Sequence, residues 1–220
     1  MKNRIPAALF FVFLVAGGSA SFSRAEERAR VVCFGDSITK RGYPAILSEL
    51  LDVESINAGV AGHTSGEGLR RMQRDVLEKA PDVVVILFGT NDLRVDNAKK
   101  HIAPEKYREN LVTMVKGCRE RGAKVVLCTL PPINAEPFFQ RHDRKVFEAA
   151  GGLTKLITEL REAAVAVAEA HKVPLVDFQK LLATKPQWMS PDGVHPSGAG
   201  NKLIAEYVAK AIEPLLASSK

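Results

Sequence analysis

The sequence has few of the residues that build disulfide frameworks, metal centres and nucleotide sites. It contains three cysteines among 220 residues, and an odd number cannot pair completely within one chain. No C-x-x-C pair occurs, and no two histidines have the helical spacing and acidic neighbours of a zinc site. No P-loop or dinucleotide-binding glycine pattern follows an apolar run. The sequence therefore gives no support to a zinc protein or a nucleotide-binding protein.

The three cysteines allow two interpretations. Cys33 and Cys128 fall within apolar runs that predict buried strands, where a thiol behaves as a small apolar group. Either all three thiols are free, or one disulfide joins Cys118 to Cys128 and leaves Cys33 unpaired.

Basic residues exceed acidic ones only modestly, and they do not cluster. The formal net charge is +6, but Lys2, Arg4 and Arg24 lie in the first 25 residues, which carry no acid, so the remainder has +3. No Lys/Arg cluster with interleaved aromatics is left, which argues against nucleic acid as a main partner. The basic pairs at residues 70–71 and 99–100 are interpreted as solvated helix or loop charges.

The N-terminal segment has the features of an export signal. Lys2 and Arg4 precede an apolar run at residues 5–16, which is too short for a comfortable membrane span. Residues 23–25 fit the small-x-small rule for cleavage before Glu26, and residues 18–20 are a second candidate. We expect residues 1–25 to be a signal peptide, with export to the periplasm or the extracellular space and no stable membrane insertion after cleavage. The alternative is an uncleaved anchor or an amphipathic N-terminal helix.

Residues 26–220 are expected to form a single α/β domain. Apolar runs predict strands at residues 30–34, 53–56, 82–88, 124–129 and 173–177. Apolar residues at helical spacing predict helices at residues 43–51, 69–77, 104–121, 153–171 and 197–216. Residues 131–147 are interpreted as a polar and aromatic loop. The alternation implies a five-stranded parallel sheet covered by helices on both faces.

Three short motifs follow predicted strands and therefore meet at one edge of the sheet. They are Gly-Asp-Ser at residues 35–37, Asn-Ala-Gly at residues 57–59 and Gly-Thr-Asn-Asp at residues 89–92. Ligands of parallel sheets bind beyond the carboxyl ends of the strands. A fourth motif, Asp-Gly-Val-His-Pro at residues 192–196, precedes the last predicted helix.

These motifs contain the parts that nucleophilic ester cleavage needs. Ser37 supplies a hydroxyl, which requires a base to become a nucleophile. His195 is the best base, because Asp192 lies three residues earlier and one helical or 3₁₀ turn would place the carboxylate beside the imidazole. Pro196 suits the first turn of the final helix. Asn91 and the N–H groups of Ser37 and Gly59 are the candidate donors to an oxyanion. Taken singly, each motif is also compatible with an ordinary turn or helix cap.

The four motifs together resemble those of the SGNH hydrolases, also called the GDSL esterase/lipase family. The first block differs only by Ile38 in place of the commoner Leu, and the resemblance extends from Val31 to about Gly200. It implies a flavodoxin-like three-layer fold, a shallow open site and no metal or organic cofactor. It also implies a catalytic triad of Ser37, Asp192 and His195, with oxyanion donors on Ser37, Gly59 and Asn91.

The substrate is expected to be a small-molecule or polysaccharide ester with a short acyl group such as acetyl. The short loops and the absence of a long apolar lid favour this interpretation. Asp36, His63, Phe138 and Trp188 are the expected substrate contacts, although the aromatic side chains are equally compatible with packing. The alternatives are a lysophospholipase or thioesterase for longer acyl chains, a non-catalytic carbohydrate-binding protein on the same fold, and a partner-binding protein of the cell envelope.

Overall fold

The computed structural model describes residues 28–217. The expected signal peptide lies outside these described residues. Within residues 28–217, no helix is both long enough and apolar enough to span a membrane.

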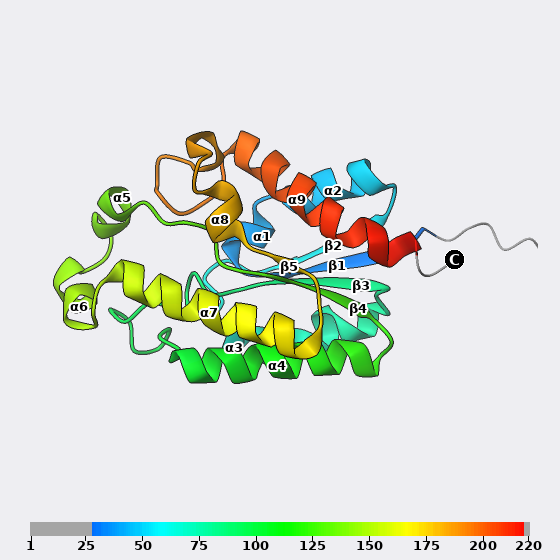
Figure 1. Ribbon diagram of the computed structural model, residues 1–220, viewed down its shortest axis with the longest axis horizontal. Coiled ribbons are helices and arrows are strands. Elements are labelled where there is room, and N and C mark those ends of the chain that lie inside the picture. Colours follow the sequence, from blue (N-terminus) through cyan, green and yellow to red (C-terminus); the bar gives the residue numbers. More distant parts are fainter. Residues whose placement is uncertain (1–27, 218–220) are drawn as a thin grey trace, which may run out of the picture.

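The centre of the molecule is a parallel sheet of five strands in the order β2-β1-β3-β4-β5 (Figure 1). The strands are β1 (Arg30–Gly35), β2 (Glu54–Gly59), β3 (Val83–Leu87), β4 (Lys124–Cys128) and β5 (Leu175–Val176). This is the flavodoxin-like strand order, so the predicted fold class is confirmed. Gly35 pairs with both Gly59 and Leu87 at the carboxyl ends of β1, β2 and β3. The Asn-Ala-Gly motif, predicted to follow the second strand, instead forms the last three residues of β2. The three motifs nevertheless meet at one edge of the sheet.

Helices cover both faces of the sheet (Figure 1). One face carries α2 (Tyr43–Leu51) and α9 (Gly198–Ala217), and the other carries α3 (Ser65–Asp75), α4 (Pro104–Glu120) and α7 (Leu153–His171). Two separate apolar cores result. Val31 and Cys33 of β1 belong to the α2/α9 core, whereas Val32 and Phe34 belong to the other core. Successive side chains of a strand point to opposite faces, so both sides of β1 must be apolar.

Residues 131–147 were predicted as a loop, and that prediction was wrong. They contain α5 (Ala135–Phe139) and most of α6 (Arg144–Ala149). The side chains of Asn134 and Asp143 cap these helices by accepting hydrogen bonds from the N–H groups of Glu136 and Lys145. Phe138 and Phe147 are buried and meet edge to face, with ring centroids 5.3 Å apart. The aromatic side chains thus anchor two short helices beside the site. The other short helices are α1 (Ser37–Lys40), α8 (Phe178–Leu182) and the 3₁₀ turns Leu77–Lys79 and Pro186–Trp188.

Two helix starts also differ from the sequence prediction. Helix α3 begins at Ser65, four residues early, because Thr64 and Glu67 form a reciprocal capping box. Helix α9 begins at Gly198, so Pro196 lies outside it, in an isolated antiparallel bridge with Met189.

All three cysteines are free and buried. Cys118 lies in the core on the α4 side of the sheet and Cys128 in the core on the α9 side, so the sheet separates them and a Cys118–Cys128 disulfide is excluded. Burial raises the pKa of Cys33 and of Cys118 to about 12, which leaves little reactive thiolate at neutral pH.

Candidate active site

Ser37, His195 and Asp192 form a continuous hydrogen-bonded chain. Ser37 is the first residue of α1, directly beyond β1, and the Asp36 side chain caps this short helix by accepting from the Ile38 N–H at 2.9 Å. The His195 Nε2 atom lies 2.8 Å from Ser37 Oγ, and the His195 Nδ1 atom lies 2.6 Å from Asp192 Oδ2. This arrangement allows the imidazole to take a proton from the serine while the carboxylate orients the ring.

The segment that carries Asp192 and His195 is a tight turn rather than the predicted helical or 3₁₀ turn. Asp192 Oδ1 accepts hydrogen bonds from the His195 N–H at 2.9 Å, the Val194 N–H at 3.0 Å and the Ser190 hydroxyl at 2.8 Å. Gly193 has a φ of +77°, and its carbonyl oxygen accepts from the Asn134 N–H at 2.8 Å. The α5 segment therefore holds this turn in place.

Hydrogen bonds keep Asp192 ionised. Partial burial on its own would raise the pKa of this carboxyl, but the N–H groups of His195 and Val194, the His195 ring and the Ser190 hydroxyl outweigh it. The net effect holds the pKa of Asp192 well below its ordinary value. The carboxylate is thus negative whenever His195 becomes positive in a reaction.

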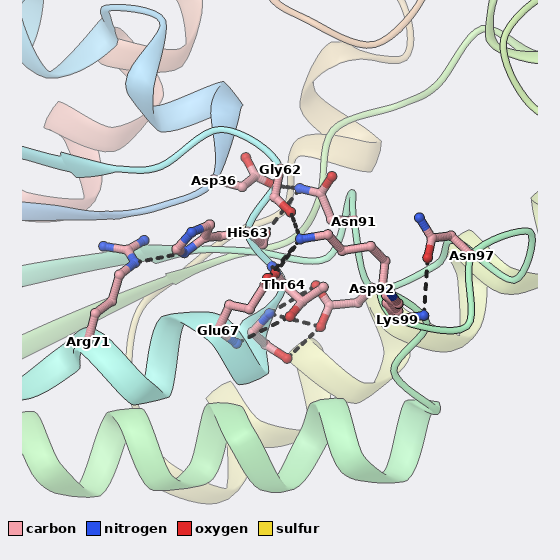
Figure 2. A network of polar contacts seen from close by, with 12 residues as sticks. Asp36, Gly62, His63, Thr64, Glu67, Arg71, Asn91, Asp92, Asn97 and Lys99 are labelled. Carbon is pink, nitrogen blue, oxygen red and sulfur yellow. Dashed lines mark hydrogen bonds and ion pairs between the residues drawn. The ribbon is translucent and has the colours of Figure 1, made fainter.

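The three candidate oxyanion donors lie beside the serine, and two of them have partners within the protein. The Asn91 amide donates to the His63 carbonyl oxygen at 3.0 Å and to Asp36 Oδ2 at 3.4 Å (Figure 2). The Gly59 N–H donates to Asn57 Oδ1 at 3.0 Å. The Ser37 N–H belongs to the first turn of α1, where backbone donors have no intrahelical acceptor.

Gly59 is required by the close approach of two backbones. A Cβ at this position would lie 2.3 Å from the main-chain nitrogen of Lys40. No side chain fits there, so the end of β2 can pack directly against α1 only through a glycine.

A cleft of about 630 Å³ opens above these residues. Its lining includes Ser37, Asn91 and His195, together with the apolar residues Ala61, Phe138 and Val194. Of the four expected substrate contacts, only Phe138 is among the residues that line this cleft, and it is itself only 2% exposed and packed in the core on the α4 side of the sheet. Asp36 lies buried beneath it, the side chain of Trp188 is 2% exposed within the α2/α9 core, and His63 and Gly59 lie just outside the lining. Across residues 28–217, no group of three or more His, Cys, Asp or Glu side chains could hold a metal ion.

Residues 33–203 match the model of the GDSL-like lipase/acylhydrolase family. The chain belongs to this family. It is 31% identical to esterase TesA from Pseudomonas aeruginosa, over 83% of this chain and 87% of that protein. It is 30% identical to an acetylxylan esterase from Xylanibacter ruminicola, over 86% of this chain and 44% of that protein. The crystal structure of a lipase/acylhydrolase from Enterococcus faecalis superposes with a TM-score of 0.71 at 28% identity, covering 84% of this chain and 96% of that one. The resemblance seen in the motifs is thereby confirmed, and the chain is a carboxylic ester hydrolase.

Sequence reasoning missed a buried and heavily bonded arginine of this GDSL-family esterase. Arg71 was interpreted as a solvated charge, but it is only 7% exposed. Its guanidinium donates to the carbonyl oxygens of Gly35 at 2.7 Å and Ala58 at 2.8 Å, and it lies over the Phe34 ring at 4.6 Å. Arg71 thus ties together the ends of β1 and β2, from which Ser37 and Gly59 extend. The guanidinium carries five N–H donors in a rigid plane, which lets it bond several acceptors at once. The only sequence indication of this role was that Arg71 falls in a predicted helix, and that did not distinguish it from a solvated arginine.

The same network fixes His63 and Lys100. The ring of His63 turns toward Arg71, whose Nε atom donates to His63 Nδ1 at 3.1 Å (Figure 2). Burial, followed by the positive charge of Arg71, lowers the pKa of His63. Lys100, also interpreted as solvated, donates to Glu67 and to the Gly62 carbonyl oxygen at 2.8 Å. Of the two basic pairs that were interpreted as solvated, only the first residue of each, Arg70 and Lys99, is exposed.

Two buried carboxyl groups lie behind the Asn91 side chain of the esterase. Burial raises the pKa of Asp36 to about 7, and the nearby Asp92 adds to that rise. Burial likewise raises the pKa of Asp92 to about 6, although the Ser65 side chain and N–H donate to it. Asp92 therefore holds the start of α3 against the loop that carries Asn91, while Asp36 caps the helix that carries Ser37.

Proposed function

We propose that this esterase cleaves carboxylic esters with Ser37 as nucleophile, His195 as general base and acid, and Asp192 as the group that orients His195. The proposal rests chiefly on one observation, the Ser37–His195–Asp192 chain with distances of 2.8 Å and 2.6 Å. These residues come from two ends of the sequence, 158 positions apart, and their alignment matches the roles that such a mechanism requires.

The reaction would proceed through an acyl-enzyme. Ser37 Oγ attacks the ester carbonyl carbon as His195 Nε2 takes the hydroxyl proton. The tetrahedral intermediate collapses, the bond to the alcohol oxygen breaks, and His195 returns the proton to that leaving oxygen. Water then attacks the acyl-serine with His195 again acting as base, which releases the acid and restores Ser37.

The developing negative charge on the carbonyl oxygen would be met by the N–H groups of Ser37 and Gly59 and by Asn91. The Asn91 amide has two hydrogens, and the longer of its two contacts, 3.4 Å to Asp36, is the one that a substrate oxygen would replace. At Gly59 the substrate oxygen would compete with the Asn57 side chain. Donors of this kind act on the transition state more strongly than on the ground state.

The preferred substrate is proposed to carry a short acyl group, most simply acetyl, on a carbohydrate or another small alcohol. The lining of the cleft favours this, because it offers only Ala61, Phe138 and Val194 as apolar contacts, which is little surface for a long acyl chain. The similarity to an acetylxylan esterase points the same way. Export of the mature protein is part of the same proposal and rests on the N-terminal sequence pattern.

The test is the hydrolysis of p-nitrophenyl esters from acetyl to dodecanoyl by the protein lacking residues 1–25, with Ser37→Ala alongside. We expect serine-dependent turnover that is greatest with acetyl or butyryl. A maximum at long acyl chains would contradict the short-acyl proposal and favour a lysophospholipase or thioesterase. Turnover unaffected by Ser37→Ala would overturn the mechanism. No turnover on any ester would favour a non-catalytic binding protein.

A further inference from the structure

The cleft beside Ser37 is lined by basic side chains and by no acidic ones. Lys40, Arg41, Arg94 and Arg141 all contribute to it, whereas none of the lining residues is Asp or Glu. The chain as a whole has nearly balanced charges, with 31 basic and 25 acidic residues, so this local excess is not a reflection of composition. A concave surface of one charge sign concentrates oppositely charged ligands.

One of these four cations already has an acidic partner within the described part of the chain, and the other three do not. The Arg94 guanidinium pairs with Asp96 at 2.7 Å, and Asp96 also contacts His142 at 3.0 Å. Arg94 is therefore already neutralised. Lys40, Arg41 and Arg141 have no carboxylate partner among residues 28–217. We call these three residues the cationic rim.

Two residues of the rim are joined by hydrogen bonds to the segments around His195. Arg141 donates through Nη2 to the main-chain oxygen of Asp192 at 2.6 Å, which holds the arginine beside the His195 turn. The main-chain oxygen of Arg41 accepts from the Asn201 side chain at 3.3 Å, at the start of the helix that follows His195. His195 is the group that returns a proton to the leaving oxygen in the proposed mechanism. Arg141 is therefore held close to the group that would protonate the leaving oxygen, and the main chain of Arg41 is joined to the helix that follows His195.

Three unpaired cations around one concave site repel one another unless an anion lies between them. The backbone positions of Lys40 and Arg41 are set by the short helix α1 and its end, and the Arg141 guanidinium is held by the Asp192 main-chain oxygen. Arginine side chains also match the planar, two-oxygen geometry of a carboxylate.

We propose that the cationic rim binds a carboxylate on the alcohol part of the substrate. The substrate class is then an O-acylated acidic sugar or a similar hydroxy acid whose ester lies within reach of Ser37. This inference rests on the proposed esterase function, and it adds to that function a charge requirement on the leaving group.

The first experiment compares 4-carboxyphenyl acetate with its neutral analogue 4-carbamoylphenyl acetate. The ratio of their kcat/KM values is divided by the ratio of their uncatalysed hydrolysis rates, which removes the difference in leaving-group reactivity. We expect a preference of about tenfold for the carboxylate at low ionic strength, falling toward unity in 1 M salt. Equal normalised values for the two esters, or a preference that salt leaves unchanged, would overturn the proposal.

A second pair of substrates tests whether the rim recognises a carboxylate on the acyl part of the ester rather than on the alcohol part. p-Nitrophenyl hemisuccinate carries a carboxylate on the acyl part, and p-nitrophenyl butyrate is its neutral counterpart. We expect the acyl-side carboxylate to give less than a twofold advantage. A larger advantage on the acyl side than on the alcohol side would contradict the placement of the subsite.

The double variant Lys40→Gln with Arg41→Gln tests the residues themselves and leaves in place the bond from Arg141 to the Asp192 turn. We expect it to lower kcat/KM for the carboxylate ester about tenfold while changing that for the neutral ester less than threefold. Lys116→Gln, on the exposed side of α4, removes one positive charge far from the cleft and serves as the control. Equal losses for both esters would overturn binding by the rim.

Failure of this inference and failure of the esterase function are distinguishable. If the neutral acetate is hydrolysed in a Ser37-dependent manner without any charge preference, the esterase proposal stands and the rim proposal falls. If Ser37→Ala leaves hydrolysis of both acetates unchanged, the proposal that Ser37 is the nucleophile falls, and the rim proposal falls with it.

Discussion

The side-chain amide of Asn91 donates a hydrogen bond to the main-chain oxygen of His63 at 3.0 Å. This bond joins the loop after β3 to the loop after β2, and it aims the amide toward the cleft that Ser37 lines. Neither residue is close to the other in sequence. The position of the proposed oxyanion donor is therefore set by a contact between two loops.

Replacing Asn91 by Ala is expected to lower kcat by about 10²-fold or more, because one oxyanion donor is lost. KM for a short ester should change much less, since the donor acts mainly in the transition state. Steady-state kinetics with p-nitrophenyl acetate measure both constants. An unchanged kcat would remove Asn91 from the proposed oxyanion hole.

Asp192→Asn should reduce kcat by less than Ser37→Ala does, though still by orders of magnitude. The amide can no longer stabilise a positive imidazole, and it disturbs the tautomer that presents Nε2 to Ser37. Asn keeps an oxygen for the N–H groups of Val194 and His195, so the turn should survive. Matched circular dichroism spectra with a large loss of rate are the expected outcome. A rate near that of wild type would argue against Asp192 as the orienting group.

Gly193→Ala should destabilise the turn that carries Asp192 and His195 for two reasons, which are backbone strain and a steric clash of the added Cβ. The residue has a φ of +77°, and an added Cβ would lie 2.4 Å from Pro137 Cγ and 2.9 Å from the Asn134 oxygen. Gly122→Ala is the matched control, because its φ is +80° and nothing lies within 4 Å of the added Cβ. We expect Gly122→Ala to cost about 1 kcal/mol of unfolding free energy and to leave activity intact. Gly193→Ala should cost more and lower kcat. Equal effects of the two substitutions on stability and activity would contradict the steric argument.

Arg71→Lys is expected to destabilise the protein by about 2–4 kcal/mol, because the lysine cannot satisfy the buried carbonyl oxygens of Gly35 and Ala58 together. Activity should fall as well, since these residues end the strands that carry Ser37 and Gly59. Thermal denaturation and esterase kinetics give the two readouts. The neighbouring Arg70 is exposed, so Arg70→Lys should change neither. If Arg71→Lys is equally silent, Arg71 does not hold the two strand ends.

Asp36 should make stability fall as the pH rises. Its pKa is about 7 in the folded protein against an ordinary value of 3.8, so the unfolded chain loses this proton first. The stability linked to Asp36 is fully present below pH 3.8 and is lost as pH rises toward about 7. We expect Asp36→Asn to flatten this part of the profile, measured as unfolding free energy by urea titration at each pH.

Two comparisons control the pH experiment. The Asp52 carboxylate is 89% exposed, so Asp52→Asn should leave the slope between these pH values as in wild type. Asp192 changes the unfolding free energy in the opposite direction with pH, because its pKa is lowered in the folded protein. Its stabilising contribution is present above pH 3.8 and is lost at lower pH. A wild-type slope that persists in Asp36→Asn would show that this carboxyl is not the source.

Several features followed from local sequence patterns. Five apolar runs specified the strands, and helical spacing placed the helices within a few residues, as in residues 153–171. The apolar side chains of β1 face two cores, and a strand buried on both sides reads directly as a continuous apolar run. The capping signal Thr64-x-x-Glu67 was present and would have placed the start of α3 correctly.

Other features depended on contacts between distant segments. Arg71 is buried against main-chain acceptors at the ends of two strands, which lie 13 and 36 residues away in the sequence. The local Arg-Arg sequence therefore could not reveal that Arg71 is buried. Trp188 and Phe138 have similar aromatic character in the sequence, yet one packs beneath α9 and the other lines the cleft.

The sequence by itself determined the order of strands and helices, the motifs that mark the family and the residue types available for chemistry. These depend on side-chain periodicity and turn chemistry over a few residues. Only the tertiary structure decided which charges are paired, which polar groups are buried and which side chains face the cleft. Those properties depend on desolvation and on partners brought together from remote parts of the chain, and the cationic rim around Ser37 is one such property.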